Sequence, residues 1–125
     1  MSKYNLYLNL IFEMCQKLEK TSLDKLNDAD VWDATLMRFQ VIGENLKKIP
    51  KRIKSKHQEA KWKNFEWFRN QISHEYKTVL PEVIRDLIKN DVSKLKKEIK
   101  RILAEEKNEN KKNKKFFSIH FHGEK

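Results

Sequence analysis

Apolar residues recur at helical spacing in four stretches of the chain, over residues 3–20, 28–48, 57–73 and 81–103. Within each stretch they fall three and four positions apart, the spacing that places side chains on one face of an α-helix. Glycine and proline occur only twice each, and charged residues make up 37% of the sequence. Few positions therefore favour turns, and many residues are good helix formers. The pattern predicts an all-α fold, a four- to five-helix up-and-down bundle.

Capping and turn residues mark the ends of two of these helices. Asp28 or Asp30 precedes the second stretch, where a carboxylate oxygen can accept backbone N–H groups of the first turn. Pro81 opens the fourth stretch, at a position that tolerates proline. The fourth helix is long, and we expect Asn90 and Asp91 to bend it.

The C-terminal part differs in composition from the rest. We divide the chain into a helical domain, residues 1–104, and a basic polar tail, residues 105–125, whose first half is nearly all Lys, Asn and Glu. Such a composition buries too little apolar surface to order itself. The apolar end, 116–122, is interpreted as a frayed tail, a segment that docks a partner, or an extra packed element. His120 and His122 could touch a metal ion there, but two ligands make no site.

The net charge of +10 is concentrated in one segment. Residues 47–63 hold eight basic residues against one acid, Glu59, and so supply +7 of it. A polyanion such as RNA would suit this segment, and a solvated lysine-rich face is the competing interpretation. We expect the basic residues to make individually replaceable RNA contacts and His57 to be solvated. The residues concerned are Lys47, Lys48, Lys51, Arg52, Lys54, Lys61 and Lys63.

Other features limit the class of protein. The single cysteine, Cys15, lies on the apolar stripe of the first helix and is expected to be a small core residue, with no disulfide partner. The N-terminus shows no signal peptide, and no stretch approaches the roughly 20 apolar residues of a membrane span. We therefore expect a cytoplasmic protein without a membrane partner.

The segment 69–76 (RNQISHEY) carries the candidate chemistry. Histidine titrates near neutral pH and can move the proton of an RNA 2′-OH, and arginine can hold a phosphate while negative charge builds up. Such cleavage needs neither a metal nor a cofactor. On an ideal helix Arg69 and His74 would point about 140° apart, so they converge only if the helix ends near Ser73. A helix-end ion pair and a capping histidine are the structural alternative.

Gly43 lies inside the second predicted helix. A glycine there costs about 1 kcal/mol relative to alanine, and close approach of a neighbouring helix is the usual compensation. Its neighbours Arg38 and Glu44 are interpreted either as support for the active cleft or as an exposed helix salt bridge.

From Val31 to Leu103 the chain resembles the HepT-like family of the HEPN superfamily. Three pieces in the right order support the resemblance: segment 38–44 (RFQVIGE), Trp62, and segment 69–76, which fits the family signature Arg-x4-His-x-Tyr. An Asn-Asp pair in the last helix also fits, although the proline that follows in the family is absent.

The resemblance implies an endoribonuclease toxin that acts as a homodimer. Two copies of the motif would face each other across a cleft, with Arg69 and His74 of both subunits as the catalytic residues. The supporting residues would be Asn70, Ser73, Arg38 and Glu44. The resemblance also implies an antitoxin, a minimal nucleotidyltransferase (MNT type) that attaches AMP to Tyr76. A bulky anion beside Arg69 and His74 would block the phosphate site.

Two other classes of function remain open from the sequence. The chain could be a HEPN-fold module that binds a nucleotidyltransferase or a nucleotide and cleaves nothing. It could also be a basic helical protein that binds nucleic acid in a salt-dependent way. Cleavage of RNA by the purified, unmodified protein would discriminate between these classes.

Overall fold

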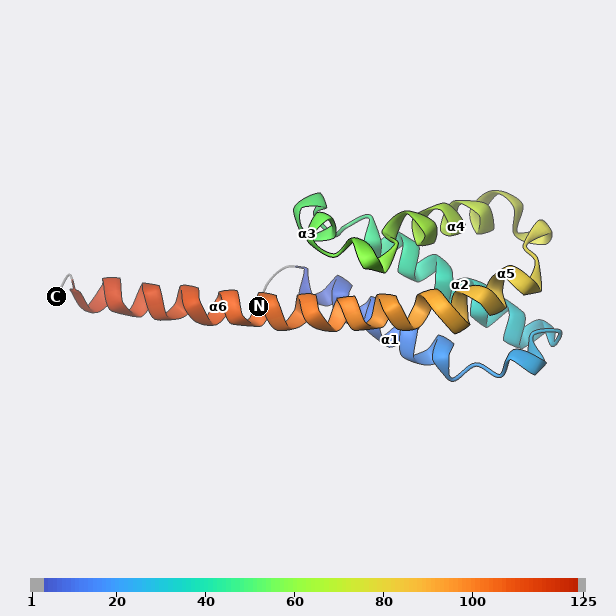
Figure 1. Ribbon diagram of the computed structural model, residues 1–125, viewed down its shortest axis with the longest axis horizontal. Helices are drawn as coiled ribbons and strands as arrows, with labels where there is room; N and C mark the ends of the chain where they lie inside the picture. The colour runs from blue at the N-terminus through green and yellow to red at the C-terminus, as the bar shows by residue number, and fades with distance from the viewer. Residues whose placement is uncertain (1–3, 124–125) are drawn as a thin grey trace.

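The computed structural model describes the backbone of residues 4–123 and the side chains of residues 4–107. Within that range the regular elements are all helical, which confirms the predicted all-α class. The α-helices are α1 (Asn5–Glu19), α2 (Ala29–Leu46), α3 (Lys51–Lys56), α4 (Trp62–Glu75), α5 (Pro81–Asp86) and α6 (Val92–Gly123), as Figure 1 shows.

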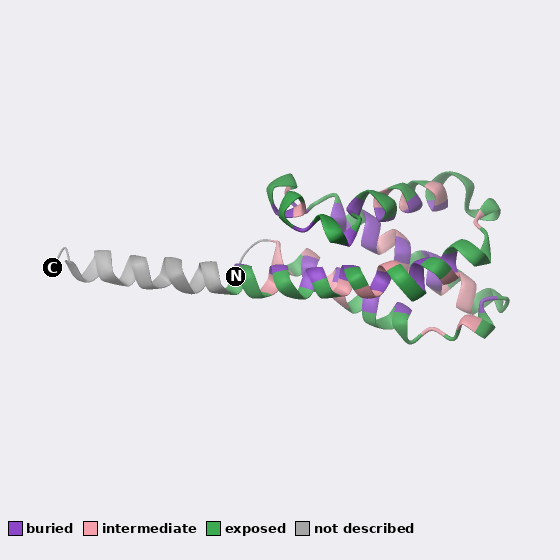
Figure 2. Ribbon diagram, viewed as in Figure 1, coloured by how far each residue is buried: buried purple, intermediate pink, exposed green. Residues whose placement is uncertain are grey.

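Helix α2 is central to the bundle, since it packs against α1 on one side and against α4 on the other. Helix α6 packs along α1. Figure 2 shows the buried residues on the facing sides of these helices and exposed residues on their outer sides. The apolar stripes predicted from the sequence form this core. Its largest fully buried side chains include Phe39, Phe65, Leu8, Ile11, Leu95 and Ile99.

Two aromatic contacts fix α2 against α4. The ring of Phe39 stacks on Phe65 at a centroid distance of 6.4 Å and meets Phe68 edge-on at 5.2 Å. Asp28 caps α2 as predicted, because its Oδ1 accepts the N–H groups of Asp30 at 2.9 Å and Val31 at 3.1 Å. The cap therefore fixes where α2 begins, and the ring packing fixes the position of α2 relative to α4.

The third predicted helix differs from the structure at its start. The sequence predicts a helix from near His57, whereas α4 begins at Trp62 and the separate short helix α3 precedes it. Lys61 lies between α3 and α4 and interrupts the helix, because its backbone is left-handed, with φ of 53° and ψ of 50°. Helix α3 has only six residues, which is too short for a helical spacing of apolar positions to be recognised in the sequence.

The fourth predicted helix is divided where a bend was expected. Asn90 and Asp91 belong to a π-helical turn, Leu87–Asp91, which separates α5 from α6. A π turn adds one residue to the helical turn and changes which positions face the core. Both sides of it remain packed, since Ile84 and Val92 are fully buried.

Helix α6 continues to Gly123, although the sequence predicts no regular structure for residues 105–115. Lys and Glu are good helix formers, and extending a helix that already exists costs far less than starting one. Helix propagation from a packed segment therefore outweighs the lack of apolar residues to bury. His120, His122 and the rest of the apolar end lie outside the residues whose side chains are described.

Candidate active site

Residues 69–75 of the motif segment lie on the second half of α4, whose last residue is Glu75, and Tyr76 begins the turn that follows. The condition for convergence of Arg69 and His74, a helix that ends near Ser73, is therefore not met. Arg69 and His74 keep helical spacing and project about 140° apart around the helix axis. The chain first leaves the helix at Glu75, whose φ of −143° and ψ of 47° lead into the turn Tyr76–Thr78. A single chain thus does not bring both side chains to one phosphate.

Arg69 lies where α4 passes closest to α2. A methyl group placed on Gly43 would overlap Cβ of Arg69, and would lie 2.7 Å from its Cγ and 3.3 Å from the carbonyl oxygen of Phe65. The structure therefore confirms the interpretation of Gly43 as a point of close helix approach. The absence of a side chain at Gly43 lets the base of the arginine side chain lie against the backbone of α2.

The guanidinium of Arg69 is held by two long hydrogen bonds. Nη2 donates to Oε1 of Glu44 at 3.4 Å, and Nη1 donates to Oδ1 of Asn70 at 3.3 Å. Its Nε has no hydrogen-bond partner among the described residues, and a quarter of the side chain, 25%, is exposed. Of the five N–H donors of an arginine, two are used here and the Nε donor is buried, so the remaining N–H groups of the two terminal nitrogens are left for an anion such as phosphate.

A further contact between α2 and α4 was not predicted. Nε2 of Gln40 donates to Oγ of Ser73 at 3.4 Å. Gln40 precedes Gly43 by three positions, so the spacing on the helix was the signal that could have identified it. Of the predicted supporting residues, the structure places Glu44, Asn70 and Ser73 around or beside Arg69.

His74 and Tyr76 lie on the exposed surface. His74 makes no hydrogen bond or ion pair with any residue from 4 to 107, and Tyr76 is 56% exposed. Trp67, which is 59% exposed, precedes His74 by seven positions and so shares its face of α4. A large exposed aromatic ring therefore lies on the same face as the candidate catalytic histidine.

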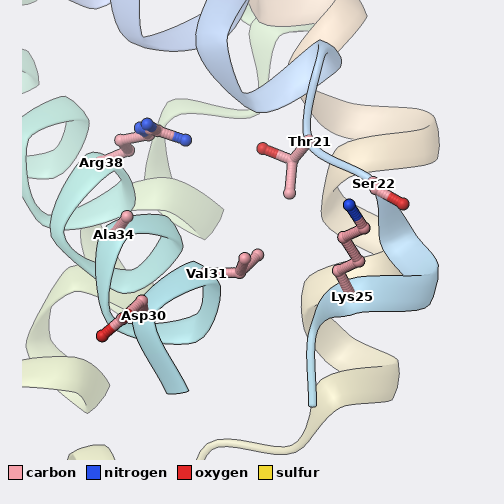
Figure 3. Close-up of a pocket in the computed structure, with 7 residues that line it drawn as sticks. All are labelled: Thr21, Ser22, Lys25, Asp30, Val31, Ala34 and Arg38. Carbon is pink, nitrogen blue, oxygen red and sulfur yellow. The ribbon is translucent and has the colours of Figure 1, made fainter. Parts of the chain in front are cut away.

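Arg38 lies apart from the other supporting residues. It borders a hollow of about 310 Å³ between the start of α2 and the connection from α1, together with Thr21, Ser22 and Lys25. Figure 3 shows its guanidinium turned toward Thr21. Arg38 and Gly43 are five positions apart, so they point about 140° apart around α2. The predicted support of the active cleft by Arg38 does not agree with this placement.

The basic segment is divided between surface and structural roles. Lys47, Lys48, Lys51, Arg52, Lys61 and Lys63 are exposed. Lys54 is not, because its Nζ donates to the carbonyl oxygen of Leu46 at 3.0 Å and to Oε1 of Glu66 at 2.9 Å. Lys54 therefore joins α3 to α2 and α4, and its charge is already neutralised.

His57 is buried, so the prediction of a solvated histidine is wrong. It is 7% exposed, and its Nδ1 lies 2.7 Å from Oε2 of Glu98 while its Nε2 lies 3.1 Å from Oε2 of Glu105. Glu98 also accepts a hydrogen bond from Nη1 of Arg101 at 2.6 Å. The partners are more than 40 positions away in the chain, which local sequence patterns do not reveal.

Cys15 is a core residue, as predicted. Burial raises the pKa of its thiol from 9.0 to about 12, and the negative charge of Glu19 adds to this effect. The described residues contain no group of three or more His, Cys, Asp or Glu side chains able to hold a metal ion. None of the described helices has the length and apolarity that crossing a membrane requires.

Comparison with known proteins agrees with this architecture. Residues 5–102 match the HepT-like family, described as Ribonuclease HepT-like. The chain is 30% identical over 106 residues to a "putative RNase" of Caldanaerobacter subterraneus subsp. tengcongensis, covering 81% of this chain and 95% of the relative. It is 32% identical over 124 residues to a "gamma-glutamylcyclotransferase and putative RNase" of Methanocaldococcus jannaschii, covering 95% of this chain and 54% of that protein. The chain thus spans about half the length of the archaeal relative. No solved structure matches it significantly.

Proposed function

Because this chain belongs to the HepT-like ribonuclease family, we propose that it is a metal-independent endoribonuclease that uses Arg69 and His74. The observation that supports this most directly is the environment of Arg69. Its guanidinium is partly exposed, weakly bound by Glu44 and Asn70, and fixed at its base against Gly43. A fixed cation with unused donors is suited to a phosphate that gains charge in a transition state.

The proposed reaction uses the nucleophile that RNA already carries. His74 accepts the proton of the 2′-OH, and O2′ forms a bond to phosphorus while the bond from phosphorus to O5′ breaks. The leaving O5′ takes up a proton from water, His74 later releases its proton to solvent, and the products are a 2′,3′-cyclic phosphate and a 5′-hydroxyl. Arg69 holds the non-bridging oxygens as negative charge grows on them.

We also propose that the site is completed by a second copy of the chain. Arg69 and His74 project about 140° apart from one helix, so one phosphate needs the arginine of one chain and the histidine of another. The exposed face of α4 that carries Trp67 and His74 supports this arrangement, since a large exposed aromatic side chain is a common feature of interfaces.

Regulation by a partner enzyme is a further part of the proposal. The chain would be the toxin of a toxin–antitoxin pair, acting on cytoplasmic RNA and neutralised by an MNT-type nucleotidyltransferase that attaches AMP to Tyr76. The exposure of Tyr76, at 56%, leaves its hydroxyl accessible to such an enzyme. The intact mass of protein coexpressed with a neighbouring nucleotidyltransferase should increase by one AMP, and Tyr76→Phe should abolish the increase.

The experiment that tests the catalytic assignment is alanine substitution followed by RNA cleavage and growth assays. Arg69→Ala and His74→Ala should each abolish cleavage and growth arrest while circular dichroism shows an unchanged helical fold. Arg85→Ala, on α5, removes an arginine outside the site and should leave cleavage intact. If both site variants remain fully toxic, the assignment is wrong. If the unmodified wild-type protein cleaves no RNA, the alternative of a non-catalytic HEPN partner of a nucleotidyltransferase or nucleotide is favoured.

A further inference from the structure

A groove of about 800 Å³ lies between α3 and the beginning of α4, and it is here called the lysine groove. Four lysines line it, together with Trp62 and Glu66. The lysines come from different elements. Lys51 and Lys54 belong to α3, Lys61 directly precedes α4, and Lys63 belongs to the first turn of α4. Residues separated by an interruption in the helix are thus brought to one surface.

The lysine groove carries an excess of positive charge. Glu66 is the one acid among its lining residues, and it is paired with Lys54. Lys61 lies 4.0 Å from Asp91 and half of its side chain, 50%, remains exposed. Lys51 and Lys63 form no ion pair with any residue in the part of the chain whose side chains are described. Two unpaired ammonium groups, those of Lys51 and Lys63, are therefore available to an anion, with the half-exposed Lys61 beside them.

The shape of the groove is fixed before any ligand arrives. Lys54 ties α3 to α2 through the carbonyl oxygen of Leu46 and to α4 through Glu66. Nε1 of Trp62 donates to the carbonyl oxygen of Lys54 at 2.9 Å, which is a second contact that holds α4 against α3. Binding to a surface that is already held in place costs little conformational entropy.

The groove and the candidate active site lie on successive parts of α4, the groove at its beginning and the site in its second half. Helices α2 and α4 are antiparallel, since Gln40 contacts Ser73 and Glu44 contacts Arg69. One step further, Lys54 of α3 connects Leu46 to Glu66. Lys63 lies 11 residues before His74 and shares its face of α4 to within about 20°, whereas it is turned about 120° from Arg69. Glu66 lies three residues before Arg69, and Lys63 lies six residues before it. These separations correspond to about 4.5 Å and 9 Å along the helix axis.

We propose that the lysine groove binds the sugar-phosphate backbone of single-stranded RNA on one side of the phosphate that is cut, an inference that rests on the proposed ribonuclease function. Its volume is in the range of about 300–1,000 Å³ typical of small-ligand sites, which suits a few nucleotides of one strand. Lysines bind phosphates without reading bases, so the groove adds affinity and orientation and not base specificity. Substrates that reach the groove should be cleaved more efficiently than substrates too short to reach it.

The test compares a long unstructured oligoribonucleotide with a dinucleotide that has a single phosphodiester. In the double variant Lys51→Ala/Lys63→Ala, the ratio of kcat/KM for the long substrate to that for the dinucleotide should fall about tenfold. The dependence of binding on salt should also become shallower, by about 0.7 for each phosphate that the variant no longer neutralises. Lys54 is left in place because its removal would disturb the fold.

The matched control is Lys20→Ala/Lys25→Ala, which makes the same change of net charge near the connection between α1 and α2. Figure 1 shows this connection at the end of the bundle opposite α3. The control should keep the wild-type ratio. If the groove variant keeps that ratio too, or if both variants lower it equally, the groove does not bind the strand.

A binding measurement separates failure of this inference from failure of the proposed function. A labelled single-stranded oligodeoxynucleotide lacks the 2′-OH and cannot be cleaved by the proposed reaction. Weaker binding of it by the groove variant than by the control supports the groove even if wild-type protein cleaves no RNA. Equal binding by both variants overturns the groove even if wild-type protein is an active ribonuclease.

Discussion

At the scale of single residues, Gly43 and Arg69 depend on each other. The sequence predicts that a helix passes close to Gly43, and the structure shows that the close neighbour is the candidate catalytic arginine. Arg69 must be held near its base if its guanidinium is to remain oriented with only two long hydrogen bonds. Gly43 therefore affects both the packing of α2 against α4 and the position of the proposed phosphate ligand.

Gly43→Ala should destabilise the protein by about 1–3 kcal/mol, because an added methyl group overlaps Arg69 and the two helices must separate. This cost should exceed the gain of up to about 1 kcal/mol that alanine brings to a helix. Urea denaturation measures the change. Combining the substitution with Arg69→Gly, which removes the overlapped atoms, should cost less than the sum of the two single changes. A strictly additive result would show that the two positions do not touch.

Cys15 gives a prediction that depends on pH. The pKa of the thiol is about 12 in the folded protein and near its ordinary value of 9.0 in the unfolded chain. Below pH 9 the thiol is protonated in both states and its contribution to stability is complete. Between pH 9 and 12 the unfolded chain loses the proton first, so this contribution falls as the pH rises.

The free energy of unfolding should therefore fall more steeply with pH in wild-type protein than in Cys15→Ala over that interval. Denaturation of both proteins at several pH values measures the difference between their free energies of unfolding. Groups that titrate in the same way in both proteins do not contribute to this difference. Parallel curves would contradict the raised pKa. A thiol reagent should also leave folded protein unlabelled at neutral pH, since the thiolate is the reactive form.

At the scale of elements, α3 and α6 are joined through buried polar side chains. His57 follows α3 and lies between Glu98 and Glu105 of α6. Lys54, on α3 itself, reaches α2 and α4. The short helix α3, which has a single buried residue, Ile53, is thus positioned by these polar contacts more than by an apolar stripe.

His57→Leu should destabilise the protein by about 3 kcal/mol, because it leaves the buried carboxylate of Glu98 with Arg101 as its remaining partner. The double variant His57→Leu/Glu98→Leu should be less destabilised than the sum of the single variants, since no buried charge is then left without its partner. Thermal unfolding of the four proteins gives the coupling. A double variant as unstable as the sum would mean that the two side chains act independently.

At the scale of the whole molecule, the proposed site requires two chains. Because Arg69 and His74 both lie within the uninterrupted helix α4, no local break between them closes the distance that separates their side chains. The exposed faces of α2 and α4 that would meet a second copy carry Met37, 55% exposed, and Trp67. Apolar side chains of this size favour burial in an interface.

Mixing two inactive variants tests this arrangement. Dimers that pair Arg69→Ala with His74→Ala retain one arginine and one histidine across the interface, so the mixture should recover a measurable part of the RNA cleavage. Cleavage of a labelled RNA is followed after the variants are unfolded and refolded together, with each variant refolded alone as the control. A mixture that contains mixed dimers by native mass spectrometry and remains inactive would exclude a shared site.

The sequence by itself determined the all-α class and most of the core, and it narrowed the cap of α2 to Asp28 or Asp30, because helical periodicity and capping are local properties. It also indicated close approach at Gly43 and the candidate pair Arg69 and His74. The tertiary structure decided what those positions meet. Arg38 lies apart from Arg69, His57 is buried, and Lys54 holds α3 against its neighbouring helices instead of being free for RNA.

The reason is physical: these outcomes depend on contacts between segments far apart in the chain, which no local pattern encodes. The start of α4 and the length of α3 depend on such contacts as well, since Lys61 is left-handed and Lys54 bridges three helices. The segment 69–76 was thus identifiable from the sequence. The arrangement around it, with Gly43 against Arg69 and the lysine groove at the beginning of the same helix, required the folded chain.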